Sequence, residues 1–275
     1  MLILAATPIG NLSDASPRLV EHLVSSKFIA AEDTRSLLKL ANALGIKLNA
    51  RLFSLHEHNE GERIAQILEI AGEYDVLVVS DAGMPTVSDP GFLLVRAAVK
   101  ADIAVTIIPG PSAVLSALAV SGLPTDRFTF EGFLPRKTGD RKKTFESLVR
   151  EPRTMVFFES PHRILESLED AASVLGAERQ ASVSRELTKK FEHTQRGTLP
   201  ELVEWAKSEP KGEMVLVIAG AEAVEVKGED LVQQVLALIE DGIGLKQAVA
   251  EIAGAAGAGK SELYQSVLEA RKALR

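Results

Sequence analysis

Apolar runs alternate with amphipathic stretches through the first 120 residues of the chain. Five runs have the length and composition of buried strands: Leu2–Ala6, Phe28–Ala31, Leu52–Leu55, Val76–Val79 and Ala104–Ile108. Helical spacing of apolar residues lies between them, as in Glu60–Ala71 and Phe92–Lys100. This alternation predicts an α/β fold with a parallel or mostly parallel sheet and helices on both faces. Ligands of such sheets bind beyond the carboxyl ends of the strands, so the segments after the strands are the ones to search.

A second α/β unit follows from near Pro124. Its expected strands are Phe128–Phe133, Met155–Phe158, Ala181–Leu187, His193–Thr198 and Met214–Ala219. Fewer helices, such as Ile164–Leu175, separate these strands, which predicts mixed strand pairing. A polar stretch after Gly220 predicts a linker, and short helices follow at Leu231–Glu240, Leu245–Ala253 and Ser261–Leu274. We therefore expect two αβα domains, at residues 1–120 and 121–222, and a small helical extension at 228–275.

The composition is that of a globular protein, with 46% hydrophobic and 25% charged residues. No apolar run approaches the ~20 residues that a membrane span needs, and the N-terminus lacks the basic segment of a signal peptide. The chain has no cysteine, which excludes disulfides and thiolate zinc sites and fits a cytoplasmic protein. A net charge of −7 argues against a protein that coats nucleic acid non-specifically, but it leaves room for a local basic patch.

The segment Ser80–Gly91 is the most informative loop. It follows a strand, precedes a helix and holds two glycines, two prolines and two aspartates in twelve residues. Glycine permits close approach of the backbone to a ligand, proline restricts the loop shape, and the carboxylates could accept from a ribose or an amino group. The alternative is a simple turn with aspartate caps. The position of the loop at the ligand end of the sheet favours a functional role.

Other strand ends carry polar groups that allow more than one interpretation. Pro109–Ala113 is a tight turn whose amides would point into the same crevice, or a capped turn without a ligand. Glu32–Arg35 could hold a substrate hydroxyl and a phosphate, or could cap the following helix. Glu159–Arg163 and Arg185–Lys190 could assist proton removal from a hydroxyl, or could form ion pairs at the surface.

Three further motifs bear on ligands. The histidines of His56–Glu60 lack the i, i+4 spacing of helical zinc sites, so we expect a polar binding loop or a helix cap rather than a metal. Arg136–Lys143 holds five basic residues and one acid, which suits contact with phosphates, or a solvated, mobile loop. Gly254–Ser261 fits the Walker A pattern, but it follows a helical segment where a phosphate-binding loop needs a buried strand. We therefore expect a helix–turn–helix there and no ATP.

Several of these segments, in this order, closely resemble the RNA-modifying branch of the tetrapyrrole-methylase-like (class III) methyltransferases. The resemblance lies in Thr7–Leu12, Ala31–Arg35, Ser80–Gly91, Pro109–Ala113, Glu159–Arg163 and Arg185–Lys189. It extends over roughly residues 1–220, and the helical tail is similar to the C-terminal extension of that branch.

The resemblance implies a homodimeric, cytoplasmic enzyme with two αβα domains and S-adenosylmethionine bound in the cleft between them. The implied acceptor is the 2′-hydroxyl of a cytidine in the decoding region of 16S ribosomal RNA, in the small ribosomal subunit. The alternatives are a small-molecule methyltransferase that acts on a tetrapyrrole and a non-catalytic RNA-binding factor. The basic run and the helical tail favour RNA, and the polar loops at the strand ends favour an enzyme.

The resemblance also implies roles for individual residues. Donor contacts are expected at Pro8, Ser80, Asp81, Ala82, Ser88, Pro109, Gly110, Ser112, Phe158, Glu159 and the backbone near Glu213. The resemblance does not identify the catalytic base. Because a ribose hydroxyl must lose its proton during methyl transfer, our candidates are Asp33, Glu186 and Lys189. RNA contacts are expected from Arg35, His56, Arg136, Lys137, Arg141, Lys142 and Arg163, and no metal is expected.

Overall fold

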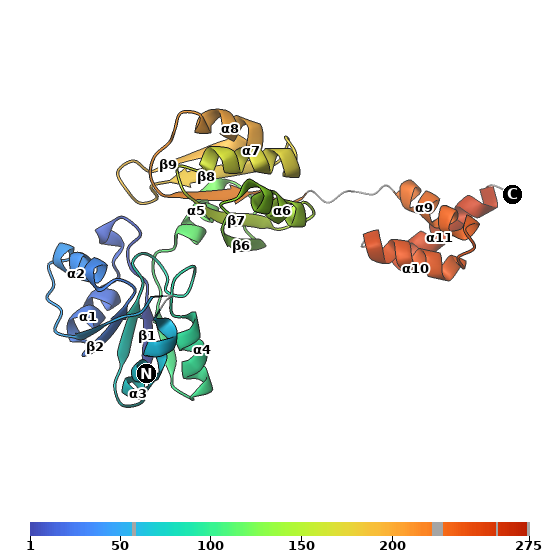
Figure 1. Cartoon of the computed structure of the whole chain (residues 1–275). Helices are drawn as coiled ribbons and strands as arrows, with labels where there is room; N and C mark the ends of the chain where they lie inside the picture. Colours follow the sequence, from blue (N-terminus) through green and yellow to red (C-terminus); the bar gives the residue numbers. More distant parts are fainter. Residues whose placement is uncertain (57–58, 222–227, 257, 274–275) are drawn as a thin grey trace. The chain divides into compact units, whose positions relative to one another are not determined.

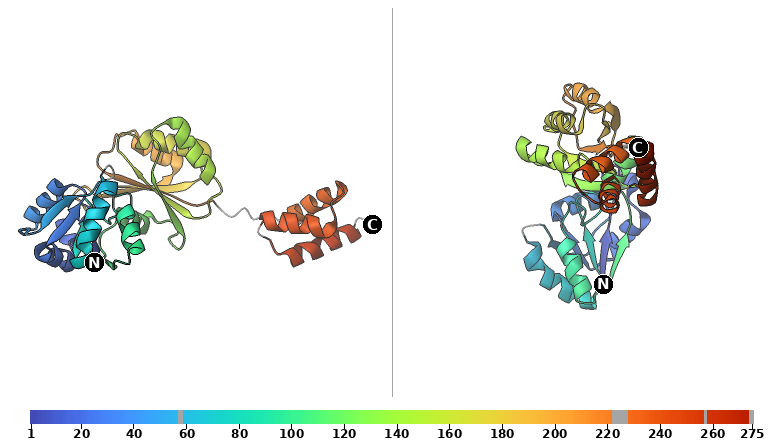
Figure 2. Two further views of the ribbon diagram at one scale, coloured as in Figure 1. Left: turned by 60° about the horizontal axis from the view of Figure 1, so that its bottom comes forward. Right: turned by 90° about the vertical axis from the view of Figure 1, so that its right-hand side faces the viewer.

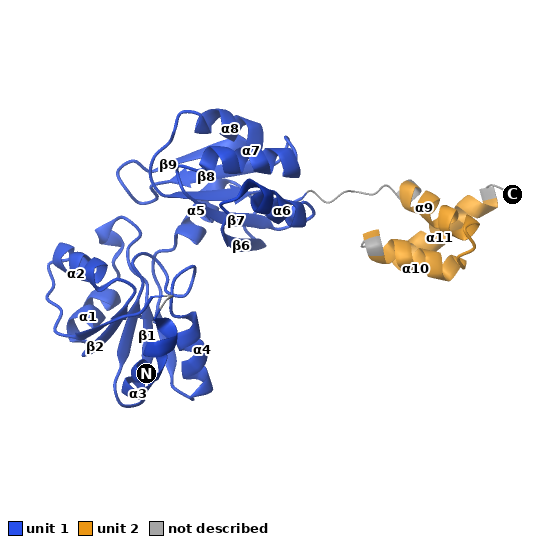
Figure 3. Ribbon diagram, in the orientation of Figure 1, with its two compact units in different colours: residues 1–221 blue, residues 222–275 orange. Residues whose placement is uncertain are grey.

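The computed structural model describes residues 1–56, 59–221, 228–256 and 258–273. The chain divides into two compact units, residues 1–221 and 222–275 (Figure 3). Unit 1 contains two five-stranded sheets, and the described part of unit 2 consists of helices (Figure 1). Residues 222–227 of the predicted linker after Gly220, and the expected helix end at Leu274, lie outside the described residues. The expected domain limits stay predictions.

Sheet 1 is parallel throughout, as predicted, and has the strand order β3-β2-β4-β1-β5. Its strands are β1 (Leu2–Ala5), β2 (Phe28–Ala31), β3 (Arg51–Ser54), β4 (Val76–Val79) and β5 (Val105–Ile108). The helices between them are η1 (Leu12–Asp14), α1 (Pro17–Ser25), α2 (Thr34–Ala43), α3 (Glu60–Glu73) and α4 (Phe92–Lys100). Because the strands are parallel, their carboxyl ends lie at one edge of the sheet, where the connecting loops gather.

The side chains of sheet 1 belong to two cores, because successive residues of a strand point to opposite faces. Leu4 and Val78 pack with α3 and α4 on one face. Ile3 and Val79 pack with α1 and α2 on the other face. Both faces are covered, which explains why the central strands β1 and β4 are apolar and buried along their whole length.

Helix starts follow the capping signals in the sequence. The Ser16 side chain caps α1 and is followed by Pro17 at the first helical position, a combination typical of helix starts. The Asp33 side chain caps α2, and the Ser112 side chain caps α5 (Ala113–Ser121). The caps at Asp33 and Ser112 follow β2 and β5, so they lie among the connecting loops at the carboxyl edge of sheet 1.

Sheet 2 has the strand order β6-β7-β10-β8-β9. Its strands are β6 (Phe128–Phe133), β7 (Thr154–Glu159), β8 (Gln180–Arg185), β9 (His193–Thr198) and β10 (Met214–Ile218). β6 runs parallel to β7 and the other neighbours are antiparallel, so the predicted mixed pairing is confirmed.

Helices cover both faces of sheet 2 (Figures 1 and 2). Helices α6 (Thr138–Leu148), α7 (Ile164–Leu175) and α8 (Leu199–Ala206) share one core with the sheet. Helix α5 lies on the other face, where Val114 and Leu118 pack near Val156 and Val217. Helix α5 therefore follows sheet 1 in the chain but belongs to the core of sheet 2.

Helix α8 is absent from the predicted elements, although the sequence carries a signal for it. Thr198 and Glu201 form a capping box, in which each side chain accepts a hydrogen bond from the backbone amide of the other residue. Pro200 lies in the first turn. Thr198 is both the last residue of β9 and the N-cap of α8, so the helix follows the strand pattern without an intervening turn.

Unit 2 folds around its own apolar core, which includes Val235, Val249 and Val267. Its helices are α9 (Gly228–Glu240), α10 (Leu245–Ala256) and α11 (Lys260–Ala273). The Walker-like run Gly254–Ser261 begins inside α10 and ends inside α11, so it follows a helix, as predicted. None of the helices in the described part of the chain is long and apolar enough to cross a membrane.

Candidate active site

The loops after β1 and β4 are tied together at the carboxyl edge of sheet 1. The Thr7 amide donates to the Gly83 carbonyl at 2.9 Å, and the Gly83 amide donates back to the Thr7 carbonyl at 3.1 Å. Gly83 has a φ of +83°, a conformation that strains other residues. The two loops therefore form one continuous wall.

A cavity of about 390 Å³ lies beside this wall in unit 1, and we call it the central cavity. Loops of sheet 1, helix α5 and the edge of sheet 2 contribute its lining: Ile9, Ala82, Gly83, Met84, Val87, Asp89, Ser112, Ala113, Val114, Phe133, Phe158, Glu159, Ser160, Pro161, Leu187, Glu213, Met214 and Val215. Phe133 and Phe158 have ring centroids 5.3 Å apart and form an aromatic wall. Small-molecule sites have this size and this mainly apolar lining with a few polar groups.

Five of the predicted donor contacts line the central cavity: Ala82, Ser112, Phe158, Glu159 and Glu213. The other six are not among its lining residues: Pro8, Ser80, Asp81, Ser88, Pro109 and Gly110. Those six lie in the loops that carry the lining. Ser80 is buried, and its hydroxyl donates to the Gly83 carbonyl at 3.3 Å. A Cβ at Gly110 would lie 2.9 Å from the Cβ of Ala6, so only glycine fits between this turn and β1.

Most of the apolar lining is absent from the predicted site residues. It includes Ile9, Met84, Val87, Val114, Leu187, Met214 and Val215. Such residues have the same apolar pattern as core residues in the sequence, so only the fold shows that they face a cavity. For Ile9, Met84, Val87 and Leu187 a signal was present, because they lie inside the strand-end motifs Thr7–Leu12, Ser80–Gly91 and Arg185–Lys190.

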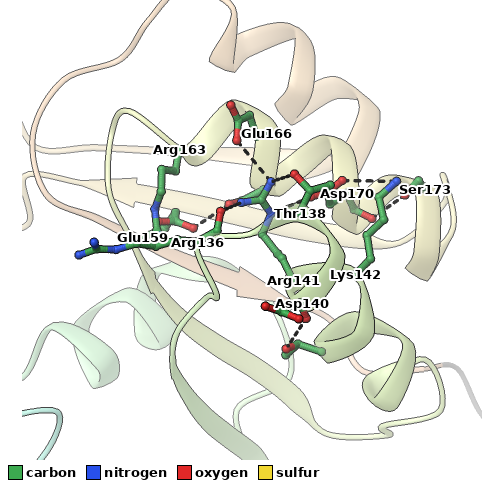
Figure 4. Close-up of polar contacts among 12 residues, drawn as sticks. Arg136, Thr138, Asp140, Arg141, Lys142, Glu159, Arg163, Glu166, Asp170 and Ser173 are labelled. Carbon is green, nitrogen blue, oxygen red and sulfur yellow. Dashed lines mark hydrogen bonds and ion pairs between the residues drawn. The ribbon is translucent and has the colours of Figure 1, made fainter.

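Glu159 contributes to the cavity without presenting its carboxylate. The side chain is 0% exposed, and its oxygens accept from the Ser160 amide at 2.7 Å and from the Ser167 hydroxyl at 2.6 Å. The Arg163 guanidinium also donates to it (Figure 4). The carboxylate of Glu159 is therefore committed to holding the turn between β7 and α7.

Asp89 lines the cavity and is absent from the predicted site residues, although it lies in the predicted loop. Its carboxyl group hydrogen-bonds to Ser80 and interacts with the charges of Glu32 and Asp81. Partial burial and the negative charge of Glu32 raise the pKa of Asp89 from its ordinary value of 3.8 to about 6. A carboxyl group with a pKa in this range exchanges a proton readily near neutral pH.

The loop that carries Asp89 is held in a demanding conformation. Thr86 and Ser88 have φ values of +75° and +62°, which non-glycine residues rarely adopt. The buried Glu60 of α3 accepts at 3.1 Å from each of the amides of Gly91 and Leu94, where the loop enters α4. Backbone strain of this kind persists only where surrounding contacts impose it, and it concentrates at functional sites.

Asp33 lies in an environment that opposes proton uptake. The Arg35 side chain donates to it at 2.7 Å and the Arg35 amide at 2.8 Å. These hydrogen bonds lower the pKa of Asp33 to about 2. Asp33 is also absent from the lining of the central cavity. Its observed tasks are to cap α2 and to pair with Arg35, whose side chain remains 84% exposed.

Lys189 and Glu186 hold each other in their charged forms. Lys189 donates to Glu186 at 3.0 Å and to Glu213 at 2.8 Å. Burial opposes the charge of Lys189, but these hydrogen bonds outweigh it and raise its pKa above 10.5. The hydrogen bond from Lys189 lowers the pKa of Glu186. Lys189 also contacts the first loop, because a Cβ at Gly10 would overlap its Cγ.

The expectation that Arg141 contacts RNA is wrong. Its side chain is 1% exposed and donates to Asp170 at 2.7 Å and to Glu166 at 3.4 Å (Figure 4). Burial of a guanidinium requires such partners, because an unpaired charge in the interior is costly. Lys142 also pairs with Asp170, at 3.5 Å, while its side chain stays 42% exposed.

The other predicted RNA contacts differ in their exposure. Arg136 and Lys137 are exposed just before α6, and His56 is exposed after β3. Arg163 pairs with Glu159, and its side chain is 21% exposed. The alternative metal site at His56–Glu60 involves residues 57–58, which lie outside the described residues. The described residues contain no group of three or more His, Asp or Glu placed to hold a metal ion.

Comparison with known proteins places this arrangement in a class. The family described as Tetrapyrrole (Corrin/Porphyrin) Methylases matches residues 1–203. The crystal structure of the methyltransferase CobJ has a similar fold, with a TM-score of 0.60 and 19% identity, over 80% of this chain and 94% of that chain. Uroporphyrin-III C-methyl transferase from Thermus thermophilus, complexed with S-adenyl homocysteine, has a TM-score of 0.55 and 16% identity, over 79% of this chain and 96% of that one. The chain belongs to the tetrapyrrole methylase family, and the family predicted from the sequence is confirmed.

A curated relative narrows the comparison within this family. Ribosomal RNA small subunit methyltransferase I of Mycobacterium tuberculosis (strain CDC 1551 / Oshkosh) is 46% identical over 273 residues. The match covers 98% of this chain and 95% of that protein. It therefore includes both sheets and the helical unit.

Proposed function

We propose that this protein transfers a methyl group from S-adenosylmethionine to the 2′-hydroxyl of a cytidine in the decoding region of 16S ribosomal RNA. The observation that carries this proposal is the central cavity, formed by the strand-end loops in a chain that matches a ribosomal RNA methyltransferase over nearly its whole length. A cavity of about 390 Å³ with apolar walls suits one small molecule, not a stretch of RNA. We therefore assign it to the methyl donor.

The chemistry of the lining fits this donor. Bound S-adenosylmethionine supplies an electrophilic methyl group on a positively charged sulfonium. Phe133 and Phe158 provide an aromatic wall that can pack against a flat ring. Asp89 and Glu213 bring negative charge to a lining without a basic side chain, which favours a cationic ligand. Ser112, at the start of α5, offers its hydroxyl and the amides of a helix N-terminus.

We further propose that Asp89 takes the proton of the acceptor hydroxyl. A ribose hydroxyl is a weak acid, and a base works best when its pKa lies near the working pH. The pKa of Asp89, at about 6, meets this condition better than that of Asp33, at about 2. Lys189 and Glu186 are fixed in a charged pair and hold the edge of sheet 2 in place. Positioning of the hydroxyl in line with the methyl group supplies much of the remaining rate.

We propose that the RNA contacts come from exposed basic side chains of unit 1. Arg35, Arg136, Lys137 and Lys142 retain exposed surface, and His56 lies at the same edge of sheet 1 as Arg35. Arg141 is excluded from this set by its burial. Small ribosomal subunits are made in the cytoplasm, so we expect the enzyme to act there.

We also propose that two copies associate into a homodimer. Helix α4 exposes Phe92 and Val99, which are seven residues apart and share one face, at 60% and 66% exposure. Ile107 of the edge strand β5 is 43% exposed. Apolar side chains gathered in this way favour a protein interface. Substitution of both Phe92 and Val99 by glutamate is expected to yield monomers in light scattering, whereas a wild-type protein that is itself monomeric would contradict the proposal.

The test of the main proposal is transfer of labelled methyl from S-adenosylmethionine to small ribosomal subunits purified from a strain that lacks this gene. We expect label in an alkali-resistant 2′-O-methyl nucleotide, and none in subunits from the parent strain, where the site is already methylated. Donor binding without RNA label would favour a small-molecule acceptor, such as a tetrapyrrole. Absence of donor binding in calorimetry would contradict our assignment of the central cavity.

A further inference from the structure

A second cavity, of about 420 Å³, lies at the edge of sheet 2, and it shares no lining residue with the central cavity. We call it the Trp205 cavity. It is lined by Arg185, His193, Trp205, Ser208, Glu209, Pro210 and Lys211. Arg185 ends β8 and lies opposite His193 at the start of β9 in the strand pairing. The remaining lining comes from the end of α8 and the loop that follows it.

Two aromatic rings in this cavity are stacked. The rings of His193 and Trp205 have centroids 6.3 Å apart and an interplanar angle of 29°. Trp205 is partly buried against the core of sheet 2, which fixes its ring, and His193 is exposed. A fixed aromatic surface of this kind can stack with any of the nucleobases, because every base has a flat π-face.

Two basic side chains line the same cavity as the stacked rings. Arg185 and Lys211 are both in the lining, and the Arg185 guanidinium donates to the Lys211 carbonyl at 3.3 Å. Glu209 is the acidic member of the lining. Two residues before His193, Phe191 is 64% exposed, and the Lys190 ammonium lies 5.5 Å from its ring centroid. Alternation of cations and aromatic rings is typical of surfaces that bind single-stranded nucleic acid.

The two cavities lie on either side of the same strand ends. Arg185 lies opposite Met214 in the pairing of β8 with β10, and Met214 lines the central cavity. Glu186 follows Arg185 and accepts from the amide of Glu213, another lining residue of the central cavity. The ends of β8 and β10 therefore separate the two cavities, and a chain of linked nucleotides could reach both.

We propose that the Trp205 cavity binds a nucleotide of the substrate RNA that flanks the methylated cytidine, with its base stacked on Trp205 and His193. Its phosphate contacts Arg185 and Lys211. This inference rests on the proposed function, because it assumes an RNA acceptor at the central cavity. The inference adds to the proposed function a second site, which fixes how the RNA strand is aligned relative to the central cavity.

The test uses the full-length protein and two probes. Trp205 is the chain's single tryptophan, so its fluorescence reports on this cavity alone. We expect a nine-residue oligocytidine to quench this fluorescence in a saturable manner that weakens as salt rises. Anisotropy of the same oligonucleotide, labelled with fluorescein, measures binding anywhere on the protein. Oligonucleotide binding without quenching would overturn the proposal, and so would the absence of any binding.

Variants of the lining distinguish this site from other basic surfaces. Lys211→Glu and His193→Ala should each weaken oligonucleotide binding by about fivefold or more. Glu209→Gln should strengthen it, because a negative charge near the phosphate is lost. Lys207→Gln is the matched control, since Lys207 lies on the same segment, pairs with Glu204 and is not in the lining. Equal weakening by Lys207→Gln and Lys211→Glu would contradict a specific site.

Two further readouts separate this inference from the proposed function. Calorimetry of S-adenosylmethionine should give the same affinity for Lys211→Glu as for the wild type, because the donor occupies the other cavity. If cytidine monophosphate alone quenches Trp205 as tightly as the oligonucleotide does, the site binds free nucleotides and the RNA assignment fails. Failure of methyl transfer to ribosomal subunits, with quenching by the oligonucleotide intact, would reject the proposed function and retain a nucleotide site.

Discussion

Glu60 and Gly91 are joined by a hydrogen bond of 3.1 Å from the Gly91 amide to the buried Glu60 carboxylate, which links α3 to the end of the Asp89 loop. The same oxygen accepts from Leu94. A side chain of one helix thus satisfies the free amides at the start of another. The shape of the central cavity depends on this contact, because the loop that it holds supplies part of the lining.

Substitution Glu60→Ala should destabilise the fold and weaken donor binding. The amides of Gly91 and Leu94 would lose their buried acceptor, which costs about 1–3 kcal/mol. Thermal unfolding and calorimetry with S-adenosylmethionine measure the two effects. Glu62→Ala is the control, since Glu62 is exposed on the same turn of α3. If both variants behave alike, Glu60 does not support the loop.

Activity should depend on the ionisation of Asp89. Because the carboxylate accepts the proton in our proposal, methyl transfer should rise with pH through about 6, the pKa of Asp89, and then level off. Asp89→Asn should lose most of the activity and this rise together. A single-turnover rate at several pH values tests this, and an unchanged profile in Asp89→Asn would exclude Asp89 as the base.

The same group should shape the pH dependence of stability. The folded-state pKa of Asp89, about 6, lies above the ordinary 3.8, so the folded state binds its proton more tightly than the unfolded state does. The resulting stabilisation is complete below pH ~4 and is lost as pH rises through about 6. Asp89→Asn should therefore raise the melting temperature relative to wild type at pH 8 but not at pH 4. Equal shifts at both pH values would contradict the raised pKa.

Substitutions Arg141→Met and Arg136→Gln should distinguish a structural role of Arg141 from an RNA-binding role of Arg136. Arg141 is buried beside Asp170, and its loss leaves that carboxylate without its closest partner, at a cost of about 3–5 kcal/mol. Arg136→Gln, at an exposed position, should leave stability within about 0.5 kcal/mol and weaken RNA binding. Chemical denaturation and filter binding measure these two quantities. If the Arg141→Met protein is stable but binds RNA weakly, Arg141 contacts RNA directly after all.

Removal of residues 222–275 should weaken RNA engagement but spare donor binding. Every lining residue of the central cavity lies in unit 1, and unit 2 has its own core. We expect unchanged affinity for S-adenosylmethionine and slower methylation of ribosomal subunits. Methylation at the full rate by the truncated protein would show that unit 2 takes no part in RNA binding.

Local patterns in the sequence predict most of the elements, because strands, caps and strand-end loops depend on nearby residues. Ser16-Pro17 marks a helix start in the sequence and in the structure, and Val76–Val79 is a strand in both. Long-range partners decide what the sequence could not show. Arg141 looks like its basic neighbours until Asp170, 29 residues away, pairs with it. The pKa of Asp89 likewise depends on Glu32, which only the parallel sheet brings near.

The position of α5 has a consequence for how unit 1 folds. This helix leaves sheet 1 and places Val114 and Leu118 in the core of sheet 2. A fragment that begins at residue 121, at the expected domain limit, would therefore expose one apolar face of its sheet to water. The strands of sheet 2 all follow α5 in the chain, but the core on this face of the sheet includes α5. We expect a fragment that begins at residue 112 and keeps α5 to be more stable than one that begins at residue 121.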